Sequence, residues 1–149
     1  MQSVAHILES KRHQRVHTIA PHASVLQALT LMAEMGIGAL LVMENERVVG
    51  IMSERDYARK VELKGRTAKD TTVAEIMTRN VIYVRPHQTN EECMALMTEG
   101  RLRHLPVMDD GKLVGLISIG DLVADIISEQ QFTIEQLQHY IQGLSLIHI

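Results

Sequence analysis

The segments VGIMSERD (residues 49–56) and VGLISIGD (residues 114–121) decide the fold, because they are two copies of one pattern. In each copy, an apolar stretch that contains a glycine is followed by a serine, two variable residues and an aspartate. The offset of 65 residues between the copies also places Pro21 opposite Pro86, with no gap in between. An internal repeat of this kind indicates that one structural unit occurs twice in the chain.

Each copy predicts the same order of elements: a strand, a helix, two strands and a second helix. In the first copy, Ser24–Gln27 has the form of a capping box that opens a helix, and Gly36 ends it. Thr89–Glu92 has the same form in the second copy. The predicted strands are β-rich or apolar runs at 16–19, 39–43, 47–52, 81–84, 104–108 and 112–117.

The chain is therefore predicted to have five parts. Repeat 1 covers residues 16–62 and repeat 2 covers residues 81–128, each starting at its first strand. Residues 63–80 form a polar linker with a short helix opened by a capping box at Thr72–Glu75. An N-terminal helix and lead-in occupy residues 1–15, and a C-terminal helix and tail occupy residues 129–149.

The two terminal helices allow two interpretations. Val4, Ile7 and Leu8 suggest the first helix. Thr133–Gln136 resembles a cap for a second helix, which carries Ile134, Leu137 and Ile141 on one stripe. Both helices could cover the edges of the core, or they could form a surface for a dimer or another partner. The sequence does not separate these alternatives, and it assigns no role to the final residues, LSLIHI.

Composition excludes several classes of partner. The formal charge is −3 and 46% of the residues are hydrophobic, so we expect a globular protein without general attraction to nucleic acid or membranes. The single cysteine, Cys93, cannot form an internal disulfide, and no apolar run reaches the roughly 18 residues of a membrane span. The N-terminus lacks the apolar core of a signal peptide, so we expect the cytoplasm.

No sequence motif indicates catalysis. GxGxxG, Walker, HExxH and CxxC patterns are all missing, as is a Ser-His-Asp arrangement with its local motifs. We therefore expect no enzyme, no catalytic cofactor and no metal.

The twin motifs, together with RHLPV at residues 103–107, resemble the family of paired CBS (cystathionine-β-synthase) domains, in particular stand-alone two-domain proteins. This resemblance implies an α+β fold, in which two β-α-β-β-α repeats pack through their sheets about a pseudo-twofold axis as a Bateman-type module. It also implies a homodimer, and two clefts that bind an adenine ligand such as AMP, ATP or NAD. Such a module would regulate a protein partner in trans.

The resemblance and the chemistry of the side chains together give candidate sites. Ser53 can donate a hydrogen bond to a phosphate, Arg55 can add a charged fork, and Asp56 can accept from ribose hydroxyls. We also expected free backbone N–H groups at this strand-to-helix corner. The first site is predicted to contain Thr18, Ile19, Ala39, Leu40, Ser53, Arg55 and Asp56, and the second Ile82, Tyr83, Arg103, His104, Pro106, Ser118 and Asp121.

A simpler interpretation stays open for the same residues. A serine followed three residues later by an aspartate is a common helix cap. If the two motifs only cap their helices, they bind no ligand. On that alternative the chain is a dimeric protein-interaction module that works without any ligand. The sequence does not tell which adenine ligand each site prefers, whether a ligand occupies both sites, or which partner is regulated.

Overall fold

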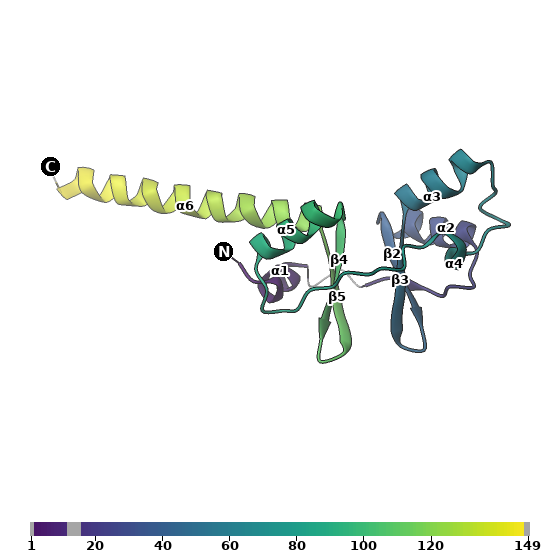
Figure 1. The fold of residues 1–149 in the computed structure, drawn as a ribbon. Helices are drawn as coiled ribbons and strands as arrows, with labels where there is room; N and C mark the ends of the chain where they lie inside the picture. Colours follow the sequence, from purple (N-terminus) through teal and green to yellow (C-terminus); the bar gives the residue numbers. More distant parts are fainter. Residues whose placement is uncertain (1, 12–15, 148–149) are drawn as a thin grey trace.

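Two small sheets stand face to face at the centre of the molecule, with helices on their outer sides (Figure 1). The computed structural model describes residues 2–11 and 16–147. The elements of the first half are α1 (Val4–Ser10), β1 (Thr18–Ile19), α2 (Val25–Met35), β2 (Ala39–Glu44), β3 (Arg47–Ser53), α3 (Glu54–Lys60) and a 3-10 turn (Glu62–Lys64). Those of the second half are α4 (Val73–Ile76), α5 (Asn90–Gly100), β4 (His104–Asp109), β5 (Lys112–Ser118) and α6 (Ile119–Ile147).

The two sheets have the same central hairpin. In the first sheet, β1 pairs in parallel with β2, which pairs antiparallel with β3, while the second contains β4 and β5. Ser53 lies opposite Ala39 in the first hairpin, and Ser118 lies opposite His104 in the second. The register therefore places the serine of each motif beside the start of its neighbouring strand. The predicted α+β fold with two packed repeats is confirmed.

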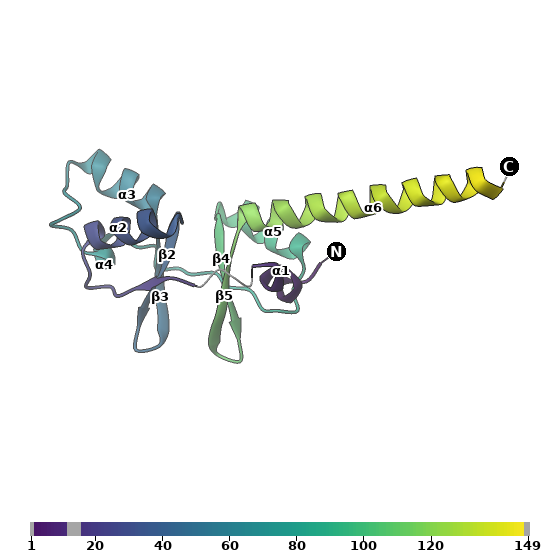
Figure 2. The ribbon, with the colours of Figure 1, turned by 180° about the vertical axis from the view of Figure 1, so that it is seen from behind.

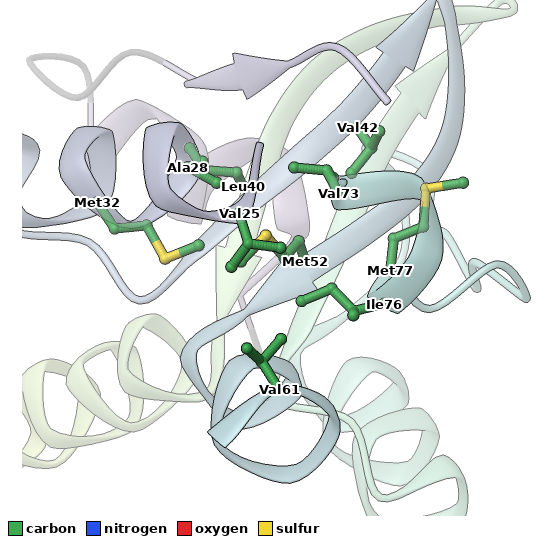
Figure 3. Close-up of a cluster of buried hydrophobic side chains, with 10 residues drawn as sticks. All are labelled: Val25, Ala28, Met32, Leu40, Val42, Met52, Val61, Val73, Ile76 and Met77. Carbon is green, nitrogen blue, oxygen red and sulfur yellow. The ribbon is translucent and has the colours of Figure 1, made fainter. Parts of the chain in front are cut away.

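The core of each repeat is completed by the helix that precedes the other repeat. Val73 and Ile76 of α4 are buried against α2, β2 and β3 of repeat 1 (Figure 3). Val4 and Ile7 of α1 are buried in the core of repeat 2. Figure 2 shows α1 beside β5 and α5, on the opposite side of the molecule from α4. The N-terminal helix thus covers a core edge, and it does so on the second repeat.

Matching hydrogen bonds hold the two lead-in segments. The N–H groups of Val73 and Ala74 donate to the carbonyls of Ala23 and Pro21, at 2.8 and 2.9 Å. In the other half, the N–H groups of Val4 and Ala5 donate to Gln88 and Pro86, at 2.7 and 2.9 Å. Because backbone and apolar contacts repeat together, the crossing of the lead-in segments is a property of both halves of the module.

The glycine of each motif gives the lead-in segment room to approach. A Cβ atom at Gly50 would lie 2.7 Å from the sulfur of Met77 and 2.9 Å from the carbonyl oxygen of Thr78. At Gly115 the corresponding Cβ would lie 2.6 Å from a methyl group of Leu8. The repeated glycine in the sequence motif is thus explained by close packing of the crossed segments.

Two sequence-based predictions about secondary structure are wrong. Residues 81–83 form no strand: only Val84 makes a single parallel bridge, with Val107, and Ile82 and Tyr83 are 39% and 51% exposed. No new helix begins at Thr133, since α6 runs without a break from Ile119 to Ile147. The Thr133 hydroxyl donates to the carbonyl of Glu129 within that helix instead of capping it.

The packing at the two glycines predicts unequal costs of substitution. Gly50→Ala should lower the free energy of unfolding by about 1–3 kcal/mol, because the Thr78 carbonyl is fixed by the Ile51 N–H at 3.0 Å. Gly115→Ala should cost less, since only the flexible Leu8 side chain has to move. Urea unfolding measures both, with Gly120→Ala as the control.

Gly120 is a suitable control because its added Cβ would meet only the Ser118 hydroxyl, at the ordinary distance of 3.6 Å. If Gly50→Ala and Gly115→Ala lowered the free energy of unfolding equally, the contact with the Thr78 carbonyl would not explain the greater cost expected at Gly50.

Candidate functional site

The strand-to-helix corner of repeat 1 is a fully formed capping box. The Asp56 N–H donates to the Ser53 hydroxyl, and the Ser53 N–H donates to the Asp56 carboxylate at 2.9 Å. The Glu54 N–H donates to the carbonyl of Gly38 at 3.1 Å. Three of the backbone N–H groups that we expected to be free for a phosphate are thus already satisfied within the protein, which corrects that expectation.

The Asp56 carboxylate is also well satisfied. Its Oδ2 accepts from the N–H and the hydroxyl of Ser53, while its Oδ1 accepts from the Thr78 hydroxyl at 3.3 Å and pairs with Lys60 at 3.0 Å. These contacts occupy about four acceptor positions, the capacity of a carboxylate. The Asp56 side chain is 12% exposed, so it lies in the wall of a cleft and not in bulk water.

This first cleft has a volume of about 550 Å³, which suits a small ligand. Its walls come from both repeats, since the Ser53–Lys60 corner faces residues 78–82 and 101–104. The apolar part of the lining consists of Ile51, Val81, Ile82 and Leu102. The cationic part consists of Arg55, Arg59, Lys60, Arg101 and Arg103.

The arginines of the first cleft are free to bind an anion. Among residues 2–11 and 16–147, the side chains of Arg55, Arg59, Arg101 and Arg103 have no ion-pair partner. Only Glu54 and Asp56 contribute acidic groups to the lining, and Asp56 is already paired with Lys60. The cleft is thus locally cationic in a chain whose formal charge is −3.

The backbone at Arg101 carries a local cost. Arg101 ends α5 in the left-handed conformation, with φ 54° and ψ 41°. Gly36 takes the corresponding place after α2, with φ 65° and ψ 37°. Left-handed backbone costs most residues roughly 1–2 kcal/mol, whereas glycine adopts it freely. An arginine at this position is therefore unfavourable for folding, and Arg101 is one of the residues that line the cleft.

The second cleft is larger, about 820 Å³, and has less charge. Lys11, which follows α1, donates to the Asp121 carboxylate at 2.6 Å and to the Leu116 carbonyl at 2.7 Å. The Ser118 and Asp121 capping contacts repeat those of the first corner. The one lysine and the one carboxylate of the second cleft thus neutralise each other.

His104 lines both clefts, because it starts β4 at the centre of the module. Burial lowers the pKa of its imidazole from the usual value, and the positive charges of Lys11 and Arg103 act in the same direction. The Asp121 carboxylate acts against them but is the weaker influence than burial. His104 is thus held in its neutral form near neutral pH.

The two candidate sites were grouped by repeat, with Arg103 and His104 able to serve either cleft, whereas the structure mixes the two groups. The first cleft brings together Ser53, Arg55, Asp56, Ile82, Arg103 and His104. The second brings together Ala39, His104, Ser118 and Asp121. Leu40 and Pro106 are buried in strands, and Thr18, Ile19 and Tyr83 do not line either cleft.

Sequence reasoning missed several residues of the clefts. Arg59 and Lys60 lie one helical turn after Arg55 and Asp56, so their spacing in SERDYARK was a usable signal. Arg101 is part of the basic run RLRH. Lys11 had no local signal, because its contact with Asp121 depends on the crossing of α1 onto repeat 2.

Two repeats with the same helix-hairpin-helix order, crossed lead-in helices and a cleft on either side of their interface define a paired-repeat module. The model of the CBS domain matches residues 4–63 and 73–128. The chain belongs to the CBS domain family, as a tandem pair.

Known proteins of the family resemble much of the chain. The mitochondrial CBS domain-containing protein CBSX3 of Arabidopsis thaliana is 39% identical over 125 residues, which are 80% of this chain and 61% of that protein. The chain thus spans less than two thirds of this plant relative. Tandem CBS proteins of this kind are in general regulatory or ligand-binding.

Solved structures agree with the fold. A CBS-domain protein from Burkholderia ambifaria has a TM-score of 0.83 and 54% identity, covering 87% of this chain and 96% of its own. A hexameric CBS-CP12 protein from bloom-forming cyanobacteria has a TM-score of 0.74 and 30% identity, covering 82% of this chain and 66% of its own. Within the described part of this chain, no helix combines the length and apolarity needed to span a bilayer.

The position of His104 predicts a pH-dependent loss of stability. In the unfolded chain the imidazole gains a proton as the pH falls below about 6.5, whereas in the fold burial opposes that proton. The unfolded state then binds more protons, so the free energy of unfolding should fall from pH 7 to pH 5. In His104→Gln this part of the pH dependence should vanish, as measured by chemical unfolding across that range.

The control is His87→Gln, which removes an exposed imidazole and should keep the wild-type slope. If His104→Gln also kept that slope, the buried, neutral state assigned to His104 would be incorrect.

Proposed function

We propose that this chain is a regulatory module without catalytic activity that binds an adenine nucleotide in its first cleft. The observation that carries the proposal is the group of unpaired arginines, Arg55, Arg59, Arg101 and Arg103, around one corner. Guanidinium groups bind phosphate through charged, paired hydrogen bonds. Several of them together favour a ligand with more than one phosphate, so ATP should bind more tightly than AMP.

The apolar half of the same cleft supports a nucleoside. Ile51, Val81, Ile82 and Leu102 provide aliphatic walls for a purine, and Ile82 is 39% exposed in the free protein. Ribose hydroxyls would bind Asp56 once Lys60 leaves it for a phosphate. The Lys60 ammonium would then also give up its hydrogen bond to the Ile76 carbonyl, at 2.8 Å, and its 43% exposed side chain leaves it room to turn toward a phosphate.

The strained backbone at Arg101 supports a ligand-binding role for this residue. A residue held in an unfavourable conformation is retained when another gain offsets the cost. Gly36, at the corresponding place in repeat 1, lines the second cleft without a charge. The second cleft is accordingly proposed as a weaker site, since a ligand there has to displace Lys11 from Asp121.

Regulation would act in trans on a protein partner, and the module would act as a homodimer in the cytoplasm. The hexameric assembly of the cyanobacterial CBS-CP12 protein supports self-association of such modules. A second candidate is a ligand-independent interaction module, which the fully satisfied capping boxes favour. The two candidates differ in whether nucleotide stabilises the fold.

Arg101→Gly tests the proposal, because its effects on stability and binding should have opposite signs. Without ligand, the variant should melt at or above the wild-type temperature, since glycine relieves the left-handed strain at this position. Millimolar ATP should raise the melting temperature of the wild type. The rise should be smaller in the variant, with ATP binding weakened about tenfold or more.

Arg85→Ala serves as the control, since it removes one exposed positive charge that lines neither cleft. It should keep the full response to ATP. No stabilisation of the wild type by ATP, AMP or NAD would overturn the proposal and favour the ligand-independent module. An unchanged response of Arg101→Gly would overturn the assignment of the phosphates to this cleft.

A further inference from the structure

The outer half of α6 is open to solvent in the described part of the chain, and only its start, at Phe132 and Thr133, lines a shallow pocket with α1. Every residue from 130 to 142 is exposed, and Figures 1 and 2 show this part projecting away from the two sheets. It is about 20 Å long at the rise of an α-helix. Isolated helices of this length are marginal in water and normally gain stability from packing. Packing against a partner would therefore stabilise the projecting part.

One face of α6 has the apolar spacing of a coiled coil. Ile127, Ile134 and Ile141 recur every seven residues, with exposures of 49%, 54% and 61%. Val123 and Leu137 lie four residues before Ile127 and Ile141, with exposures of 43% and 56%. These are the a and d positions of heptads, and together they form an apolar stripe along the helix. We call this the α6 stripe.

The α6 stripe is open along its described length, including the part beside the body. Leu122 is fully buried in the core of repeat 2, whereas the next residue, Val123, is 43% exposed. Successive residues are turned by about 100° around a helix, so the stripe lies beside the face that packs on the body. A partner helix can thus contact Val123 and Ile127 as well as the projecting residues.

We propose that the α6 stripe pairs with the same stripe of a second copy of this chain, as a parallel two-stranded coiled coil. Isoleucine at the a positions combined with leucine at d favours this arrangement. The flanking e and g positions of the outer half are uncharged, namely Gln131, Thr133, Gln138 and Tyr140. Two identical helices can therefore pair without repulsion, and there is no charge to select a different partner.

Gln130 fixes the register of this pairing. It takes the d position between Val123 and Leu137, so it is the one polar residue in the stripe from 123 to 141. A polar side chain in such a seam is best satisfied opposite its own counterpart, which holds two parallel helices in step. This pairing does not depend on nucleotide binding, so its test is separate from that of the proposed function.

Cysteine cross-linking tests the arrangement directly. The native Cys93 is buried, and burial raises the pKa of its thiol to about 11, so it should not react. Gln130→Cys and Leu137→Cys should each form disulfide-linked dimers under mild oxidation. His139→Cys, on the outer side of the helix, should not. Cross-linking at only one of the two stripe positions, at neither, or equally at all three would overturn the proposal.

Sedimentation of the full chain provides the second readout. Leu137→Glu should raise the dimer dissociation constant at least tenfold, because it places two carboxylates opposite each other in the seam. Gln136→Glu adds the same charge outside the stripe and should leave the constant unchanged. Both positions are exposed, and circular dichroism checks that the fold persists. An unchanged constant in Leu137→Glu would overturn the proposal.

Discussion

The crossing of the lead-in helices is the constraint on which the rest of this structure depends. Val73 and Ile76 precede repeat 2 but are buried in repeat 1, while Val4 and Ile7 precede repeat 1 but are buried in repeat 2. Neither repeat has a complete core without the segment that leads into the other. The crossing therefore ties the two repeats together, and the two hairpins are held face to face (Figure 1).

This arrangement creates the clefts and allows them to differ. Each cleft combines the Ser-x-x-Asp corner of one repeat with the strand entry of the other, so each repeat contributes residues to both clefts. Where repeat 1 has Gly36 and Ala39, repeat 2 has Arg101 and His104. These differences concentrate positive charge on the first cleft, while both repeats keep the same hairpin and capped corner.

Local features could be predicted from the sequence, and long-range ones could not. The repeat, the hairpins, the capping boxes at Ser24 and Thr72 and the N-cap at Thr89 depend on neighbouring residues, and these were predicted. The crossing was not, because Val4 and Val73 have similar patterns and neither shows which repeat it covers. The Thr133 cap failed because no glycine or proline interrupts the chain between Leu122 and Gln142, so α6 continues.

Amide hydrogen exchange with and without ATP tests most directly whether the two repeats build one nucleotide site between them. The account predicts slower exchange with ATP in two segments from different repeats, 53–60 and 101–104, and little change at 114–121. Protection confined to one repeat, or no protection at all, would contradict it.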